Sequence, residues 1–92
     1  MKFTAKHHRA IEGNDISVTA CADAKETMNI VRVTLDDAIL EEKRLDSGTQ
    51  SFEADYPRAG DAGPGKNHVL IVTAWEQDAT MHSSTTEWTD TN

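Results

Sequence analysis

The longest apolar stretch of this 92-residue chain, residues 68–75, constrains its fold most. This stretch reads HVLIVTAW, is rich in β-branched side chains, and follows a loop that contains Gly and Pro. Such a run is typical of a β-strand that is buried on much of both faces. A buried strand must pair its backbone groups with neighbouring strands, so the rest of the chain is expected to supply them.

Segments with period-two alternation surround this run. The clearest covers residues 16–23, where every second side chain is aliphatic and Cys21 falls in the outward phase. Similar patterns predict strands near residues 2–10, 28–36, 49–56 and 81–89. The predicted inward side chains are Ile16, Val18, Ala20, Val31, Val33, Leu35, Phe52, Leu70, Val72 and Ala74. These patterns predict an all-β fold, an antiparallel two-sheet sandwich of about seven strands in a single domain over residues 1–92.

Residues 36–47 admit two interpretations. The segment is rich in helix-forming residues, and Asp36 or Asp37 could cap a short helix that ends at Gly48. Its apolar stripe is narrow, however, so we favour a tight turn at the two aspartates followed by a short edge strand. Glu41 and Glu42 then belong to a solvated edge, where charges block unwanted strand pairing.

Four motifs resemble those of bacterial immunoglobulin-like domains. Residues 18–23 are similar to the family's V-x-A-x-A-x-D, and residues 31–37 to its V-x-V-x-V-D-G. Residues 51–54 are similar to its aromatic strand, and residues 65–76 to its G-x-H-x-L-x-A-x-A-x-D. The resemblance covers residues 14–88 and implies an immunoglobulin-like sandwich whose motifs carry no activity. It also implies that the histidine of the last motif, His68, is structural.

The chain departs from these patterns at Asp37 and Glu76, which replace a glycine and an aspartate. The Cys…Trp…Cys pattern of antibody domains is absent. Sandwiches of this kind serve as spacers, adhesins, enzyme accessories and phage decorations, so the resemblance leaves the function open.

Charge and cysteine content exclude several functions. The formal net charge of −7 argues against binding to nucleic acid or to anionic membranes, both of which require Lys and Arg. The single cysteine, Cys21, precludes an internal disulfide and suits a reducing compartment, and no signal peptide begins the chain. We expect a cytoplasmic protein, while a domain cut from a longer secreted protein would show the same features.

The loop before the central strand nearly spells a phosphate-binding motif over residues 60–67. It lacks the Ser or Thr that should follow Lys66, and a strand follows where a helix is needed, so a flexible connection between sheets is favoured. We expect residues 57–66 to be the least ordered internal segment and residues 90–92 to fray.

Histidines and carboxylates offer few candidates for a metal site. His7 and His8 are adjacent on a predicted strand, so they point to opposite faces. A site built from His82 with Glu76 or Asp78 is conceivable across the last hairpin. Zinc and copper sites usually need three or four converging ligands, however, so no cofactor is expected.

We expect a non-catalytic structural or protein-interaction module, because no set of catalytic residues is evident. Alternation points Val69, Ile71 and Trp75 outward, where a sandwich sheet normally shows polar side chains. We expect Ile30 to lie near them on a neighbouring strand. These four residues, Ile30, Val69, Ile71 and Trp75, are the predicted partner-binding site. The partner is a protein or a second copy of the chain, and two-fold self-association is the simplest case.

The length of the turn before the last strand decides which face Trp88 occupies, and we predict that Trp88 enters the core.

The alternative function is a small ligand- or metal-binding accessory subunit that uses the Gly/Pro loop and His82. A small-molecule ligand is the less favoured case.

Overall fold

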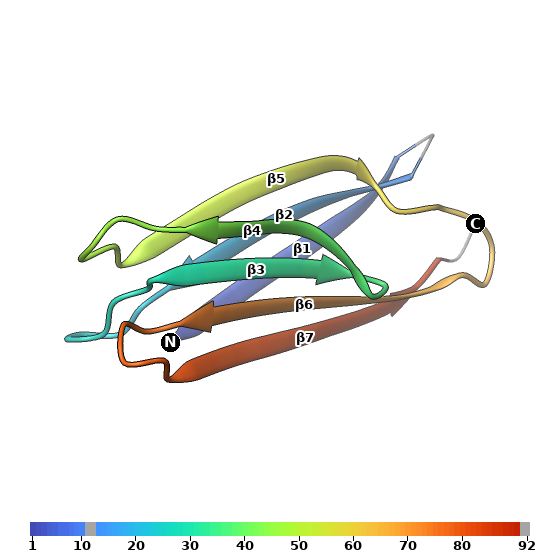
Figure 1. The fold of residues 1–92 in the computed structure, drawn as a ribbon. Helices are drawn as coiled ribbons and strands as arrows, with labels where there is room; N and C mark the ends of the chain where they lie inside the picture. The colour runs from blue at the N-terminus through green and yellow to red at the C-terminus, as the bar shows by residue number, and fades with distance from the viewer. Residues whose placement is uncertain (11–12, 91–92) are drawn as a thin grey trace.

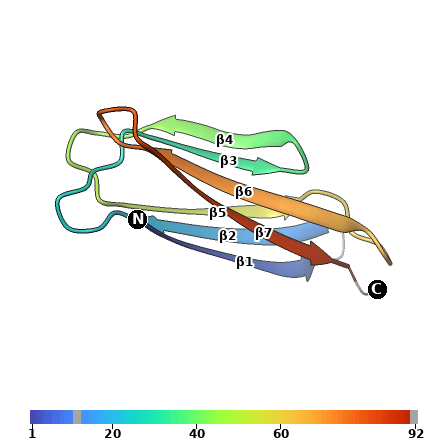
Figure 2. The same ribbon diagram turned by 90° about the horizontal axis from the view of Figure 1, so that it is seen from below.

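The computed structural model describes residues 1–10 and 13–90, which form seven strands in two antiparallel sheets (Figure 1). The strands are β1 (Lys2–Ala10), β2 (Gly13–Cys21), β3 (Ile30–Leu35), β4 (Ala38–Arg44), β5 (Ser51–Ala59), β6 (Asn67–Trp75) and β7 (Met81–Thr89). One sheet has the order β1-β2-β5 and the other β4-β3-β6-β7. Figure 2 shows the two sheets as separate layers. The predicted all-β sandwich is confirmed.

The described residues contain no helix with the length and hydropathy that crossing a membrane requires. Residues 38–44 form the strand β4, so this segment is not the helix considered as an alternative. Leu35 pairs with Ala38 across a two-residue turn, and the φ angles of Asp36 and Asp37 are 50° and 68°. Two consecutive positive φ angles are what a tight hairpin turn needs, and Asp adopts them more readily than most residues. The predicted turn and edge strand are confirmed.

The core lies between the sheets and follows the predicted alternation. All ten predicted inward side chains are buried, and Phe52, with 7% of its surface exposed, is the most accessible of them. Met28, in the connection before β3, joins the core with only 1% exposed. Met28 was not among the predicted inward residues, because in the predicted strand over residues 28–36 it shares the phase of Ile30. The structure places it before β3, where that alternation does not hold.

Side-chain contacts close the two long sides of the sandwich. On the β4/β5 side, the Tyr56 hydroxyl donates a hydrogen bond of 2.7 Å to Glu41 Oε1, and burial together with this bond raises the pKa of Tyr56. On the β1/β7 side, the rings of His7 and Trp88 stack with centroids 4.2 Å apart, and burial lowers the pKa of His7. Trp88 is half-buried and packs against the core, so its predicted inward phase is confirmed.

Two predictions about chain segments are wrong. Residues 57–59, predicted as loop, belong to β5, where Pro57 is tolerated because β5 is an edge strand. Asp90, predicted to fray, is only 6% exposed and is hydrogen-bonded, because its side chain reaches a buried histidine. Residues 91–92 lie outside the described residues. Low order in the loop that begins at Gly60 stays a prediction.

Candidate functional site

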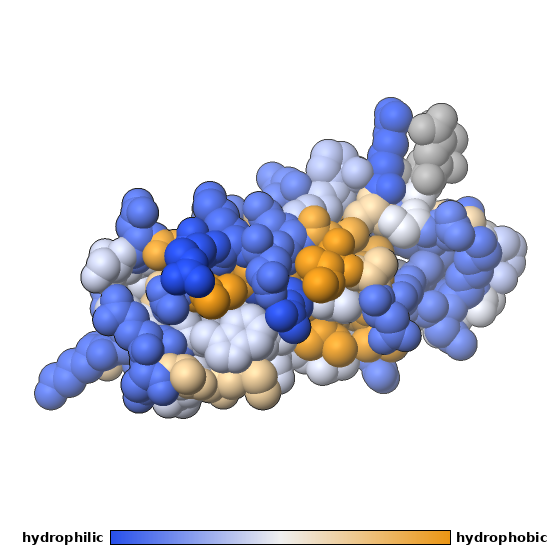
Figure 3. Space-filling model, in the orientation of Figure 1, coloured by the Kyte–Doolittle hydropathy of each residue, from blue (hydrophilic) through white to orange (hydrophobic). Residues whose placement is uncertain are grey.

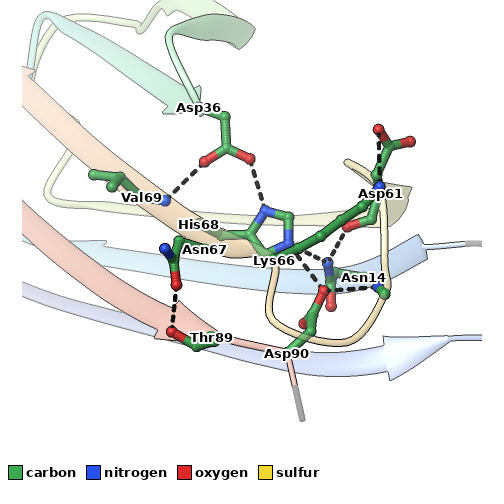
Figure 4. A network of polar contacts seen from close by, with 10 residues as sticks. Asn14, Asp36, Asp61, Lys66, Asn67, His68, Val69, Thr89 and Asp90 are labelled. Carbon is green, nitrogen blue, oxygen red and sulfur yellow. Dashed lines mark hydrogen bonds and ion pairs between the residues drawn. The ribbon is translucent and has the colours of Figure 1, made fainter. Parts of the chain in front are cut away.

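A buried histidine links four segments at the end of the sandwich where β7 finishes (Figure 4). His68 is the second residue of β6, points inward, and is 3% exposed. Its Nδ1 lies 2.7 Å from Asp36 Oδ2 in the β3–β4 turn, and its Nε2 lies 3.0 Å from Asp90 Oδ2 after β7. The side-chain amide of Asn14, in β2, lies 3.4 Å from the same Nε2. We call these four residues the His68 cluster.

The cluster favours a charged imidazolium between two carboxylates. Burial opposes the positive charge, but the hydrogen bonds with Asp36 and Asp90 outweigh it and raise the pKa of His68. Burial likewise opposes the charge on Asp90, but the bonds from His68 and from the Gly63 N–H lower the pKa of Asp90. Asp36 accepts a further bond of 2.8 Å from the Val69 N–H. Both ring nitrogens are thus engaged, which leaves no open position for a ligand.

The cluster also anchors the Gly/Pro loop before β6. The Gly63 N–H donates to Asp90 Oδ2 at 3.2 Å, and the Asn14 amide donates to the Asp61 carbonyl oxygen at 2.9 Å. The backbone of Asp90 pairs with that of the loop, donating to the Lys66 carbonyl oxygen at 2.8 Å. β6 begins directly after this loop, so the helix N-terminus that a phosphate-binding loop needs is not behind it. These contacts make the His68 cluster a structural clamp.

β7 begins at the opposite end of the sandwich, where the N-terminus lies (Figure 1), and its second residue is a histidine. His82 is in β7, and its Nε2 lies 2.7 Å from Glu76 Oε2 and 3.7 Å from Glu26 Oε2. Glu76 follows β6, and Glu26 lies in the connection between β2 and β3. The three side chains retain 21–26% exposure, and one potential ligand atom from each lies within 4.8 Å of the others. We call these three residues the His82 cluster.

Sequence reasoning found only part of the His82 cluster. The approach of His82 to Glu76 was considered, because both flank the last hairpin. Asp78, the alternative, instead accepts a hydrogen bond of 3.0 Å from the Thr80 N–H and shapes the turn. Glu26 was missed because it is distant in sequence and no local pattern relates it to β7.

The four predicted partner-binding residues lie on the solvent-facing side of the four-stranded sheet, which we call the outer face. Ile30 in β3 pairs directly with Trp75 in β6, and both are half-buried. Val69 and Ile71 lie nearer the start of β6 and are also half-buried. Strand pairing therefore brings Ile30 and Trp75 together and sets the other two apart from them.

Two exposed side chains and an arginine complete the outer face. Ile39 pairs with β3, Met81 pairs with Trp75, and these two are 58% and 59% exposed. The Arg32 guanidinium carbon lies 5.0 Å from the centre of the Trp75 ring, and Arg32 Nε donates to Glu42 Oε1 at 2.8 Å. Figure 3 shows the result, which is separate hydrophobic areas with hydrophilic atoms between them. Neither Ile39 nor Met81 was predicted, although the alternation of the edge strands could have indicated them.

A groove of about 220 Å³ lies beside the ring of Trp75, with Ile30, Arg32 and Glu42 among its lining residues. It adjoins the β6–β7 turn, where Gln77 also lines it. Its lining therefore combines the apolar side chains of Ile30 and Trp75 with the charged side chains of Arg32 and Glu42.

Comparison with known proteins identifies the fold. No family model matches the chain, and no curated protein matches it. Among solved structures, the chain is similar to the fibronectin(III)-like modules of Clostridium thermocellum CbhA. The TM-score is 0.56 at 14% sequence identity, with 96% of this chain and 97% of that chain covered. The fold is an immunoglobulin-like β-sandwich. At this identity the similarity establishes the sandwich and transfers no activity or partner.

Proposed function

We propose that this immunoglobulin-like domain is a non-catalytic interaction module that binds a second copy of itself through the outer face. The observation that carries the proposal is the apolar content of that face, where a sandwich sheet normally carries polar side chains. Its apolar residues are Ile30, Ile39, Val69, Ile71, Trp75 and Met81. These groups lie in separate areas of one face with polar residues between them, and apolar surface bordered by polar residues is typical of interaction sites.

The pair formed by Trp75 and Arg32 suits the centre of such an interface. Trp and Arg are the residue types that most often contribute the largest share of binding energy. Arg32 is held over the Trp75 ring by its ion pair with Glu42, so both side chains are already ordered before binding. Binding to an ordered surface costs less conformational entropy than binding to a mobile one.

The size and charge of the face suit two-fold self-association. The molecule extends 43 × 20 × 17 Å, so its broad face can supply the ~800 Å² that each partner buries in an interface of standard size. Charges of both signs lie on the face, with Arg32 near its centre on β3, Arg44 on the edge strand β4 and Glu87 on the edge strand β7. In a two-fold dimer the same patch meets itself, so opposite charges can be paired across the axis.

The homodimer is tested by light scattering over a range of protein concentrations. The net charge of −7 makes copies repel at low salt, so the measurement should be made at about 0.15 M salt, where the screening length is about 8 Å. Ile71→Asp and Trp75→Asp should both give folded monomers. The matched control is Thr4→Asp, which adds the same charge on β1 of the other sheet and should leave the dimer intact.

A wild type that stays monomeric at every concentration would remove the homodimer proposal. Unfolding of both outer-face variants, seen as loss of the circular dichroism of the sandwich, would show that the face is internal and would also contradict it.

A further inference from the structure

We propose that the His82 cluster binds a divalent transition metal of the zinc class, with His82 Nε2 and the carboxylates of Glu76 and Glu26 as ligands. Glu76 also lines the groove beside Trp75, but none of the three ligands belongs to the predicted partner-binding set, so the inference does not depend on the proposed self-association. Three protein ligands leave a coordination position for water, as in zinc sites that keep an open position.

The spacing of the ligand atoms fits such an ion. Zinc lies about 2.0–2.2 Å from nitrogen and oxygen ligands, which places two ligands of a tetrahedral site about 3.3–3.5 Å apart. The separations from His82 Nε2 to Glu76 Oε2 and Glu26 Oε2 are 2.7 Å and 3.7 Å, on either side of that value. Small side-chain movements would therefore bring the three atoms to bonding distance from one point.

The backbone that carries Glu26 is fixed by hydrogen bonds. The Asp23 N–H donates to Glu26 Oε1 at 2.8 Å, which leaves Oε2 directed at His82. The Gln50 side-chain amide donates to the Glu26 carbonyl oxygen at 3.2 Å. Two residues later, the buried side chain of Met28 anchors the connection in the core. The carboxylate is thus positioned without a metal, which lowers the entropic cost of binding one.

The other two ligands are fixed by the β6–β7 hairpin. His82 pairs with the buried Ala74, so its ring points toward the end of the core. The Glu76 N–H donates to the Thr80 carbonyl oxygen at 2.8 Å, and the Ala79 N–H donates to the Glu76 carbonyl oxygen at 3.0 Å. These bonds set the turn that brings Glu76 back to the histidine. Ligands held on strands and tight turns are placed more precisely than ligands on open loops.

The surrounding charges favour a cation. Asp23 and Asp78 both interact electrostatically with His82, and the only positive group beside Glu26 among the described contacts is the Met1 ammonium, 3.2 Å from Oε1. Carboxylates therefore outnumber positive groups around the cluster. Imidazole is a ligand that zinc, copper, iron and nickel accept, whereas calcium takes six to eight oxygen ligands. The mixed ligand set thus selects a transition metal over calcium.

The test uses the full chain, with zinc chloride as the probe and Cys21→Ser in every protein. Cys21 is exposed and free, and a thiolate would bind zinc by itself. Calorimetric titration should show one site. Each of His82→Ala, Glu76→Gln and Glu26→Gln should weaken zinc binding at least tenfold. The matched control is His8→Ala, which removes an exposed histidine of β1 and should leave the affinity unchanged.

A second readout assigns the zinc to this histidine. In proton–nitrogen spectra of the imidazole groups, zinc should shift the signals of His82 and leave those of His68 in place. Calcium chloride at the same concentration should produce neither heat nor shifts. The proposal is overturned if zinc does not bind, if any of the three cluster substitutions leaves the affinity unchanged in a folded protein, or if another histidine shifts in place of His82.

Discussion

The two histidine clusters lie at opposite ends of one sandwich and differ in what surrounds the ring. At His68 each ring nitrogen faces its own carboxylate, and the side chain is 4% exposed. At His82 two carboxylates converge on one nitrogen, and the side chain is 26% exposed. The same residue types therefore make a closed clamp where four segments meet and an open cluster where a hairpin ends.

The two ends also differ in how they are held together. Near His82 the core reaches the end of the sheets through large apolar side chains, Phe52 and Met28. Near His68 a loop with few apolar side chains covers the core, and polar contacts to Asp90 and Asn14 attach it. We infer that apolar packing dominates stability at the first end and the charged cluster does so at the second.

Removal of an apolar side chain at the His82 end should have the largest effect. Phe52→Ala should lower the free energy of unfolding by about 3–5 kcal/mol, because a buried aromatic ring is lost and a cavity remains. Phe52 pairs with Ala20, close to the end of β2. Denaturant unfolding, with the slope checked for constancy, measures the loss. A loss below about 1 kcal/mol would contradict the view that this end depends on apolar packing.

At the other end, His68→Ala should lower the free energy of unfolding by about 3 kcal/mol, because it leaves two carboxylates without their shared partner. Asp90 would then be buried with fewer hydrogen bonds. His8→Ala, at an exposed position of β1, is the control and should cost no more than about 0.5 kcal/mol. If the two substitutions cost the same, the His68 cluster is not a clamp.

The stability that the His68 cluster contributes should also depend on pH, with one loss at high pH and another at low pH. The pKa of His68 is raised, so its contribution is complete below the ordinary value of 6.5 and is lost as the pH rises through the higher folded value. The pKa of Asp90 is lowered, so its contribution is complete above 3.8 and is lost as the pH falls through the lower folded value. Both contributions are complete between these two reference values.

The measurement is the difference in unfolding free energy between the wild type and His68→Gln across this range. A difference is needed because the lowered pKa of His7 acts in the opposite sense below 6.5, and it does so in both proteins. The difference should be largest inside the window and smaller at about pH 9. A difference that does not change from about pH 5 to about pH 9 would show that His68 is not charged in the folded protein.

The strands and the core could be predicted from the sequence because both follow from local alternation. Whether Val31 or Val72 points inward depends on its own strand, so a period of two predicts it without knowledge of the partner strand. The turn at Asp36-Asp37 was predicted for the same reason, since a short turn depends on the conformations open to its own residues.

The clusters were only partly predicted because they depend on contacts between distant segments. The inward phase of His68 follows from alternation, but Asp90 and Asn14 reach it only through the tertiary fold. Asp90 was expected to fray because nothing in its own segment indicates a buried partner. Glu26 likewise lies far from His82 in the sequence, and only the packing of the two sheets brings the two side chains together.

The smallest effect on stability is expected from His82→Ala in the absence of metal, about 0–1 kcal/mol, because a partly exposed ion pair contributes little. The difference between the two histidine clusters should become larger when zinc is added. Zinc at about 100 times its dissociation constant should stabilise the wild type by about 2.7 kcal/mol, since only the folded protein presents the three ligands together. The His82→Ala protein, whose affinity should be at least tenfold lower, should gain at most about 1.4 kcal/mol at the same zinc concentration. Unfolding curves with a chelator and with excess zinc, both in the Cys21→Ser background, measure the two values. If His82→Ala costs as much as His68→Ala without metal, the two ends do not differ in the way proposed, and His82 is a second clamp.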